Sequence, residues 1–308
     1  MAELHPYAVT GTEEEAKGKY QIYPQRPQRK INCFTATYTH EGIRIIADCL
    51  SRQTEKDFNW IVVDKHWNMQ WFIKNIMPYG LDVIYLPEKA RYPQKFSGWN
   101  NARNTGKAFF DAELIVEFED YIWFRPDCLE RFFKIYDKCN NSVVSAVFSR
   151  CLYSSYEKAF GKDVLTDADV EVFDPTVRPR DQGVVATSIL PYVDMSNQYV
   201  GFEGNISSYP MSIIRNCPEL WDEEMDNALG FNNFQVAVEA MLLDYYILMD
   251  SDTKYYYFEH KDIGSGAWEW SSRNCRNNED YFRKKYLPKI EMWVMTKIYK
   301  KEVRGVQL

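Results

Sequence analysis

Residues 114–130 read LIVEFEDYIWFRPDCLE. An apolar run of strand-forming residues stops at Glu119 and Asp120, and Pro126 opens a helical pattern a few residues later. In open parallel sheets, ligands bind beyond the carboxyl ends of the strands. The stretch therefore predicts a strand, a turn and a helix, with an acidic ligand site at the turn.

Three further apolar runs precede this one and alternate with helical patterns. The predicted strands are Ile31–Tyr38, Phe58–Asp64, Leu81–Leu86 and Glu113–Phe118. The predicted helices cover 41–53, 69–77, 97–110 and 126–139. Because the strands are continuously apolar and alternate with helices, they predict a Rossmann-like α/β fold with a mostly parallel central sheet flanked by helices.

The second half of the chain is less regular, with few clear elements between 152 and 200. We expect a helix over Asn232–Tyr246 and two late strands, Ile247–Met249 and Tyr255–Phe258. A helical tail from residue 278 is expected to be interrupted or kinked at Pro288. The expected organisation is an N-terminal arm (1–29), one compact domain (30–265, with halves at 30–140 and 141–265) and a basic, aromatic C-terminal helical tail (266–308).

The charge of the chain is uneven. The formal net charge is −7, which argues against a nucleic-acid binder as a whole. From residue 273 to 304, however, ten Arg and Lys stand against four Asp and Glu. This tail is a candidate contact for phosphate groups or a membrane surface, with the solvated face of a helix as the alternative.

The location of the protein is inferred from what the sequence lacks. The first residues are polar, and no stretch approaches the ~18 apolar residues of a membrane span. The seven cysteines include no CxxC pair, which suits reduced thiols. We therefore expect a cytoplasmic protein, or one in the host cytoplasm if its source is viral.

Several common catalytic motifs are missing. There is no GxGxxG, no GxxxxGK[ST] and no GxSxG, and the four His and dispersed Cys do not suit a structural zinc site. Polar residues instead follow each predicted strand, at 35–39, 64–66, 88–91 and 119–121. Hard carboxylate oxygens at such an edge suit Mg²⁺ or Mn²⁺ bridging to a diphosphate, with acids that merely solvate a loop as the alternative.

The order of these pieces resembles the GT-A fold glycosyltransferases, and within them family 2. The segments that carry the resemblance are CFTATYTHEGIRIIADCLSRQT (33–54), WIVVDKHW (60–67), NNARNTGKAFFDAELIVEFED (100–120), FRPDCLERF (124–132) and GFEGNISSYPMSIIRNCPELWDEE (201–224). The resemblance as a whole spans about residues 31 to 260. The resemblance implies an inverting, nucleotide-sugar-dependent enzyme, either a hexosyl- or a pentosyltransferase.

The resemblance also implies roles for individual residues. The residues expected to contact the donor are Thr35, Tyr38, Asp64, Arg103 and Asn104, with Asp64 facing the base. The expected metal ligands are Glu119, Asp120 and His260, for Mn²⁺ or Mg²⁺. The expected carboxylate bases are Asp222 and Glu223. Five tryptophans, at 99, 123, 221, 268 and 270, are candidates for stacking on sugar faces.

The sequence departs from the family pattern at two places. The third position of the Asp-x-Asp metal motif is Tyr121, so Asp120 and Glu119 would have to bind the metal by a one-residue shift. The Glu-Asp pair that often supplies the base is replaced by Asn232 and Asn233. Because Asn cannot accept a proton at neutral pH, the nearby acids Asp222 and Glu223 are the expected general bases.

The acceptor is left open: a glycan, a lipid-linked sugar and a modified DNA base all remain. One alternative is therefore a virus-type enzyme that glycosylates modified bases in DNA, with the basic tail on the phosphates. Another is a non-catalytic GT-A-like binding module, favoured by Tyr121 and by the Asn232-Asn233 pair. A nucleotidyltransferase is disfavoured because the Gly-rich phosphate loop is missing.

Overall fold

The structure, a computed structural model, describes the greater part of the chain. The described residues are 28–37, 40–89, 99–152, 156–166, 169, 184–187, 206–227, 232–258 and 279–297. Two of the expected site residues, Tyr38 and His260, lie outside these ranges, as do Trp268 and Trp270.

The first half of the chain forms the alternating strands and helices that the apolar pattern predicts. Its strands are β1 (Ile31–Thr37), β2 (Phe58–Asp64), β3 (Val83–Pro87) and β4 (Leu114–Phe118), which run parallel to one another. Its helical elements are α2 (His40–Ser51), α3 (Met69–Asn75), the 3-10 turn η1 (Met77–Tyr79), α4 (Trp99–Lys107) and α5 (Cys128–Lys138). The expected α/β fold with a parallel set of strands is confirmed.

The second half of the chain extends the same sheet rather than building another. Its strands are β5 (Ile122–Phe124), β6 (Ser142–Leu152), β7 (Val184–Thr187), β8 (Ile206–Pro210) and β9 (Tyr246–Phe258). Its helical elements are η2 (Tyr156–Ala159), α6 (Met211–Asn216), η4 (Glu223–Asn227), α7 (Asn232–Leu242) and an unlabelled helix over 279–297. The strand order is β3-β2-β1-β4-β8-β6-β9-β5, with β7 paired to β9.

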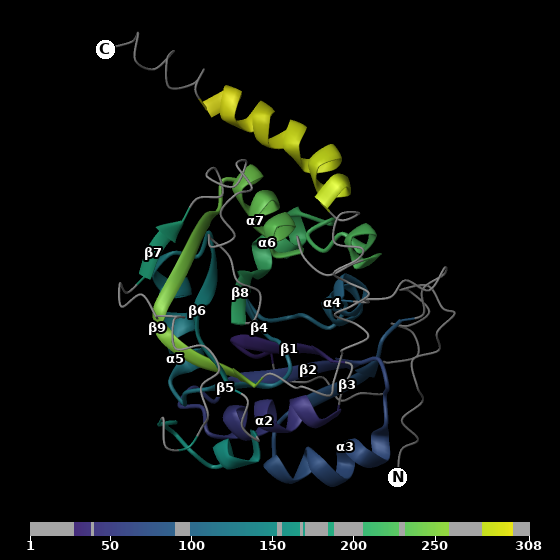
Figure 1. The fold of residues 1–308 in the computed structure, drawn as a ribbon, viewed down its shortest axis with the longest axis vertical. Coiled ribbons are helices and arrows are strands. Elements are labelled where there is room, and N and C mark those ends of the chain that lie inside the picture. Colours follow the sequence, from purple (N-terminus) through teal and green to yellow (C-terminus); the bar gives the residue numbers. More distant parts are fainter. Residues whose placement is uncertain are drawn as a thin grey trace.

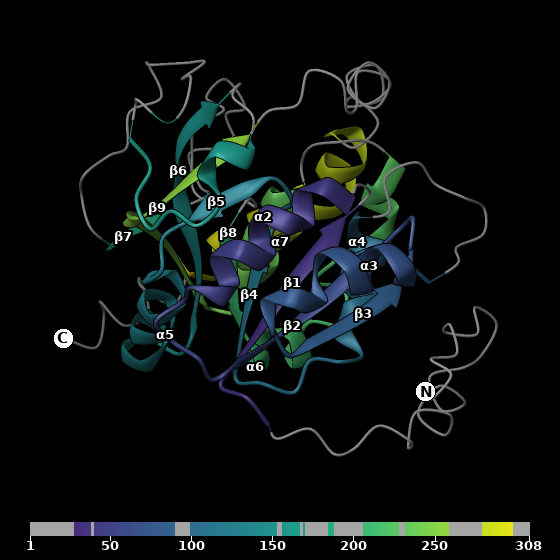
Figure 2. The same cartoon turned by 90° about the horizontal axis from the view of Figure 1, so that it is seen from below.

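Helices cover both faces of this mixed sheet. Figures 1 and 2 show α2 and α3 on one face, and α4, α6 and α7 on the other. Each face has its own apolar core: Ile46, Trp60 and Phe132 belong to the core that α2 covers, and Phe34 and Tyr286 belong to the opposite one. Because Tyr286 lies in the helix over 279–297, that expected tail helix is packed on the domain. The helix continues through Pro288, so the expectation of an interruption there was wrong.

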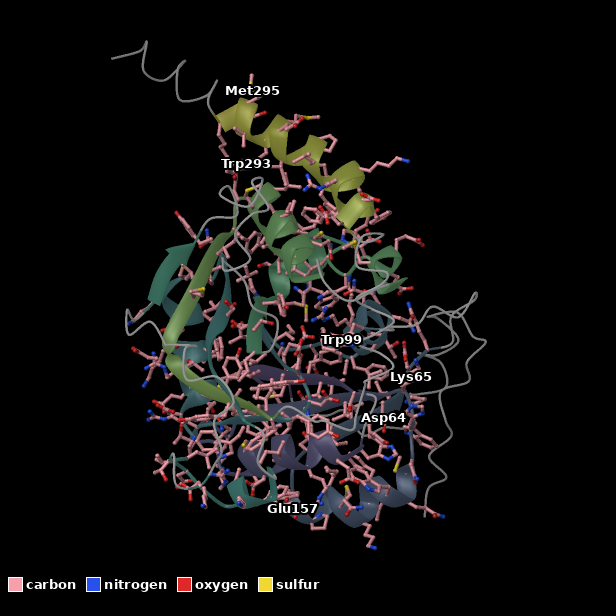
Figure 3. All side chains as sticks on the ribbon, in the orientation of Figure 1. Asp64, Lys65, Trp99, Glu157, Trp293 and Met295 are labelled. Atoms are coloured by element: carbon pink, nitrogen blue, oxygen red, sulfur yellow. The ribbon has the colours of Figure 1, made fainter. Side chains whose placement is uncertain are left out.

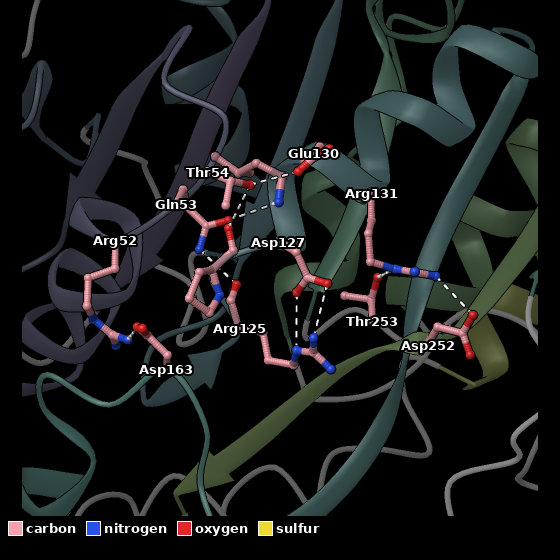
Figure 4. A network of polar contacts seen from close by, with 12 residues as sticks. Arg52, Gln53, Thr54, Arg125, Asp127, Glu130, Arg131, Asp163, Asp252 and Thr253 are labelled. Atoms are coloured by element: carbon pink, nitrogen blue, oxygen red, sulfur yellow. Dashed lines mark hydrogen bonds and ion pairs between the residues drawn. The ribbon is translucent and has the colours of Figure 1, made fainter.

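The prediction of two separate late strands was wrong. Residues 246–258 form one strand, β9, which pairs in parallel with β6 through two register shifts. Its middle reads DSDT, a polar run that resembles a turn. Asp250 is nevertheless fully buried, because Arg131 of α5 donates to both of its oxygens at 2.9 and 3.1 Å. Figure 4 shows Arg131 reaching β9 beside Thr253.

Gln53 joins two of the segments on which the resemblance was based. Its side-chain NH₂ group donates to the carbonyl oxygens of Cys49, in the last turns of α2, and of Arg125, at 3.0 and 2.9 Å. Its Oε1 accepts the backbone N–H of Leu129 at 3.0 Å. Leu129 is in the first turn of α5, where Asp127 occupies the N-cap position without a side-chain cap. Gln53 therefore satisfies the end of one helix and the start of the next. Figure 4 shows Gln53 beside Arg125.

Two further features bear on the expected location of the protein: its helices and its cysteines. Within the described ranges, none of the helices combines the length and the apolar character needed to cross a bilayer. Five of the cysteines in these ranges are free thiols: Cys33, Cys49, Cys128, Cys139 and Cys217.

We expect Gln53→Met to lower the free energy of unfolding by about 2–4 kcal/mol, because each buried backbone group left without its hydrogen bond costs about 1–3 kcal/mol. The affected groups are the carbonyl of Arg125 and the N–H of Leu129. Urea unfolding of the whole protein is the measurement. The matched control is Thr54→Val, which removes exposed hydrogen bonds from the adjacent residue. Equal losses for the two variants would contradict a bridging role for Gln53.

Candidate functional site

The carboxyl ends of the parallel strands meet, as the sequence predicts. Thr37 is paired with Asp64 across β1 and β2, and the backbone N–H of Glu88, just after β3, donates to the carbonyl of Asp64 at 3.3 Å. Thr37 Oγ1 donates to Asp120 Oδ2 at 2.9 Å, which joins the end of β1 to the turn after β4. Figure 3 labels Asp64 and Lys65 at this end of the sheet, with Trp99 of α4 above them.

The turn at 119–121 buries the side chain of its third residue, Tyr121. Tyr121 has φ 61°, in the left-handed region, and its side chain is only 4% exposed. Its backbone N–H donates to the carbonyl of Gly42 in α2 at 3.3 Å, and its carbonyl accepts from the N–H of Phe258 at 2.9 Å. A Cβ on Gly42 would meet the Tyr121 ring at 2.9 Å and Asp120 Cβ at 2.7 Å. Tyr121 is therefore packed under α2, where its ring is part of the apolar core.

The two remaining acids of the turn are the expected metal ligands. Glu119 and Asp120 are both partly exposed. Among the described residues no group of three or more His, Cys, Asp or Glu side chains is placed to hold a metal, and His260 lies outside them. Mg²⁺ is nevertheless often held by one or two carboxylates together with substrate phosphates. The donor set at 119–120 fits that kind of binding, and the metal stays a prediction.

Asp64 is committed to contacts within the protein. It is fully buried, and its Oδ1 accepts the backbone N–H of His66 at 2.8 Å. Its Oδ2 accepts the Tyr85 hydroxyl and lies 2.8 Å from His40 Nε2. The His40 ring in turn stacks on Trp71, with 4.7 Å between the centroids. Asp64 thus fixes the aromatic groups at the end of β2, and its contact with a nucleobase stays a prediction.

Thr35 and two of the candidate tryptophans are also buried. Thr35 is fully buried, and its hydroxyl accepts from Trp60 Nε1 at 3.0 Å. Trp123 and Trp221 belong to the apolar cores. Trp99, by contrast, is partly exposed at the start of α4. Among the candidate tryptophans that the structure describes, Trp99 is therefore the one placed to meet a ligand.

Arg103 forms a buried ion pair behind the strand ends. The residue is 1% exposed, and its Nε donates to Glu117 Oε1 at 2.6 Å, while Tyr209 donates to Oε2 of the same carboxylate at 3.2 Å. Burial lowers the pKa of Arg103, but the charges of Glu117 and other neighbours outweigh it, so the pKa is raised and the guanidinium stays charged. Its Nη2 is buried with no hydrogen-bond partner in the described structure. A buried cationic N–H of this kind is suited to an anionic or hydroxylated ligand.

Asn104 connects the expected donor side to the expected acceptor side. Its Nδ2 donates to the backbone carbonyl of Trp221 at 2.9 Å and to Glu223 Oε1 at 3.0 Å. Glu223 Oε1 also lies 2.7 Å from Lys89 Nζ, which follows β3. The Glu223 side chain is 24% exposed. An accessible carboxylate therefore stands beside α4, although it is 119 residues further along the chain than Asn104.

Asp222 has a different environment from its neighbour Glu223. It is 8% exposed, and its Oδ2 accepts hydrogen bonds from Tyr281, Lys285 and Tyr286, at 2.9, 2.9 and 3.0 Å. Burial raises the pKa of Asp222, but the hydrogen bond from Lys285 and the other donors outweigh it, so the pKa lies below its ordinary value. Asp222 is therefore held as a carboxylate that anchors the C-terminal helix.

The basic tail is largely paired with the body of the protein in its described part. The ion pairs of helix 279–297 are Arg283 with Glu279, Lys285 with Asp222 and Glu219, Lys289 with Glu239, and Lys297 with Asp244. All of these acids except Glu279 belong to the part of the chain between residues 219 and 244, outside the helix itself. Intramolecular docking accounts for these charges, and contact with phosphates or membranes stays a prediction.

Sequence reasoning missed the residues that support the two acids. Lys89 and the donors Tyr281, Lys285 and Tyr286 were not among the expected site residues. The opposite charges of the tail and the remainder were the available signal, since they predict mutual attraction but not which residues pair. Asn232 and Asn233 begin α7, and their side chains lie outside the described structure.

Comparison with known proteins gives a fold match. No family model matches the sequence, and no curated protein does. Solved structures of TarS from S. aureus do match. TarS 1–349 in complex with UDP-GlcNAc gives a TM-score of 0.52 at 12% identity, over 75% of this chain and 59% of that one. TarS 1–349 with UDP gives 0.50 at 13%, over 75% and 60%. A further TarS structure gives 0.53 at 13%, over 75% and 37%.

These matches confirm the expected GT-A-type fold. Identity of 12–13% shows the fold alone. The chain also spans less than two thirds of the TarS chains that it matches.

We expect Tyr121→Asp to destabilise the protein without creating a metal site. The new carboxylate would be buried under α2, and loss of the ring alone costs about 3–5 kcal/mol. The measurements are urea unfolding and the thermal shift produced by Mn²⁺. Tyr121→Phe, which keeps the ring, is expected to unfold like the wild type. A larger Mn²⁺ stabilisation for Tyr121→Asp than for the wild type would show that the third position faces the metal.

Proposed function

We propose that the protein is an inverting glycosyltransferase that moves a sugar from a nucleotide-sugar donor to an acceptor hydroxyl. The observation that carries the proposal is the contact of Asn104 Nδ2 with Glu223 Oε1 at 3.0 Å. It joins a residue expected at the donor to one expected at the acceptor, on a fold shared with a protein that was solved with UDP-GlcNAc and with UDP.

Glu223 is the general base in this proposal, and Asp222 is not. Both carboxylates were candidates from the sequence. Three side-chain donors, one of them a Lys, already occupy Asp222 Oδ2 and disfavour its protonation. Lys89 and Asn104 contact Glu223 Oε1 as well, but the Glu223 side chain is 24% exposed against 8% for Asp222, so exposure decides between the two. It takes the proton from the acceptor hydroxyl as that oxygen attacks the anomeric carbon.

The bond from the anomeric carbon to the diphosphate breaks as the new bond forms, and its electron pair leaves with the nucleoside diphosphate. The attack comes from the opposite face, so the configuration at the carbon is inverted. Arg103, with its buried and unpartnered Nη2, would bind an oxygen of the diphosphate or the sugar. Glu119 and Asp120 would hold Mn²⁺ or Mg²⁺, which when bound neutralises charge on the diphosphate. Trp99 offers an aromatic face to a sugar ring.

A non-catalytic binding module is the second candidate. The engagement of Asp222 by the C-terminal helix favours it, because one of the two expected bases is removed from proton transfer. A DNA acceptor has less support, because three of the described cations of the tail, Lys285, Lys289 and Lys297, pair with acids of the body. Measurable hydrolysis or transfer of a nucleotide sugar separates the enzyme from the binding module.

The first test is a thermal-shift screen of nucleoside diphosphates and nucleotide sugars, with and without Mn²⁺. A ligand at 100 times its Kd stabilises the folded state by about 2.7 kcal/mol. We expect stabilisation by at least one nucleotide sugar, and a smaller Mn²⁺-dependent part in Asp120→Asn. That variant keeps an oxygen for Thr37 and removes the charge. Asp127→Asn, an acid at the start of α5, is the control. No stabilisation by any nucleotide would contradict the proposal.

The second test addresses the base. Glu223→Gln keeps an oxygen that can accept the hydrogen bond from Asn104 but cannot take a proton. We expect kcat to fall about 10²- to 10⁴-fold, the usual contribution of general base catalysis. The thermal shift produced by the donor should stay close to that of the wild type. Steady-state kinetics under saturating donor measure the effect, with Glu224→Gln, the next acid in the chain, as the control. An unchanged kcat would assign the base elsewhere.

A further inference from the structure

The first turns of helix 279–297 contact the body of the protein directly beside the proposed base. Of the side chains on helix 279–297, Tyr281, Lys285 and Tyr286 converge on one oxygen, Asp222 Oδ2. Tyr286 is fully buried, and Lys285 makes a second ion pair with Glu219 at 3.1 Å. Such a set of donors on one buried carboxylate oxygen fixes its position, because moving it would leave several buried polar groups without partners.

The Asp222 side chain in turn restrains the backbone around Glu223. Its Oδ1 accepts the backbone N–H of Glu224 at 3.0 Å, so the side chain spans the residue between them. From the other side, Asn100 of α4 donates to the backbone carbonyl of Asp222 at 2.7 Å. Asn104, also of α4, holds the carbonyl of Trp221. The backbone is therefore held between α4 and the C-terminal helix on both sides of Glu223.

From these contacts we infer that helix 279–297 is a positioning element of the reaction, acting on Glu223 through Asp222. The inference rests on the proposed function, in which Glu223 is the base. In this inference Lys285 and Tyr286 are positioning residues, which act on Glu223 through Asp222. A general base must lie within hydrogen-bond reach of the proton it removes, and an error of about 1 Å can cost about 10²-fold in rate. Loosening the helix should therefore lower kcat and leave donor binding unchanged.

The test compares single-residue variants of the full-length protein. Lys285→Met removes the ion pairs with Asp222 and Glu219, and Tyr286→Phe removes one hydroxyl donor to Asp222. Lys285→Arg keeps the charge and is the rescue variant. Lys297→Met is the matched control, since it breaks an ion pair of the same helix with Asp244 and does not touch Asp222. Two readouts are used: steady-state kinetics with a nucleotide sugar, and hydrogen exchange at the backbone amides of residues 222–225.

We expect Lys285→Met to lower kcat at least about tenfold with an unchanged KM for the donor, because positioning errors act on the reacting geometry. Tyr286→Phe should change both readouts in the same direction, and Lys285→Arg should restore most of the activity. The amide of Glu224 should exchange faster in the first two variants and not in Lys297→Met, because its acceptor on Asp222 is no longer held.

The outcomes separate this inference from the proposed function. If the wild type turns over a nucleotide sugar but Lys285→Met loses no more kcat than Lys297→Met, the positioning role is wrong and the proposed function stands. Unchanged exchange at 222–225 overturns the inference whatever the activity is. If the wild type turns over no nucleotide sugar, the proposed function fails, and faster exchange then shows that the helix holds this segment for another purpose than the proposed transfer.

Discussion

The buried ion pair between Arg103 and Glu117 is the interaction on which the candidate site depends. It fastens α4 to β4, and the hydroxyl of Tyr209 fastens the same carboxylate to β8. Both charges are withdrawn from water, so removing either partner would leave the other buried and unpaired, typically at a cost of about 3–5 kcal/mol. The orientation of α4 about its axis is fixed by this pair. The contacts of Asn100, Asn101 and Asn104 are made from that same orientation.

The sequence NNARN, residues 100–104, then distributes contacts around α4. Asn100 reaches the backbone of Asp222, and Asn101 donates to Glu88 Oε1 and to the carbonyl of Lys89, after β3. Asn104 reaches Glu223. A short run of amides on one helix thereby joins the end of a parallel strand to a segment more than a hundred residues away. Amides suit this task because each offers two N–H donors and carries no charge that would have to be neutralised.

The parallel half of the fold was predictable because its signals are local. Apolar runs specify the strands, helical spacing specifies the covering helices, and parallel strands must bring their carboxyl ends to one edge. The direction of Tyr121 was not predictable, because it depends on a left-handed backbone conformation and on the space above Gly42. The continuity of β9 was hidden for a similar reason. Its buried Asp250 is acceptable only because Arg131, 119 residues earlier, neutralises it.

The neighbours Asp222 and Glu223 show why residue type alone did not settle the candidate base. Asp222 is surrounded by donors from a helix that begins more than fifty residues later, whereas Glu223 contacts Lys89 and Asn104 at the strand ends. Both residues carry a carboxylate, but the elements that pack on them differ. Asp222 therefore anchors the C-terminal helix, whereas Glu223 stays accessible. Some of the basic residues of the tail are neutralised by acids of the body, since Lys285, Lys289 and Lys297 form ion pairs with them. Part of the charge imbalance in the described tail therefore has an internal counterpart, and Lys285 ties the tail to the same segment that carries the proposed base.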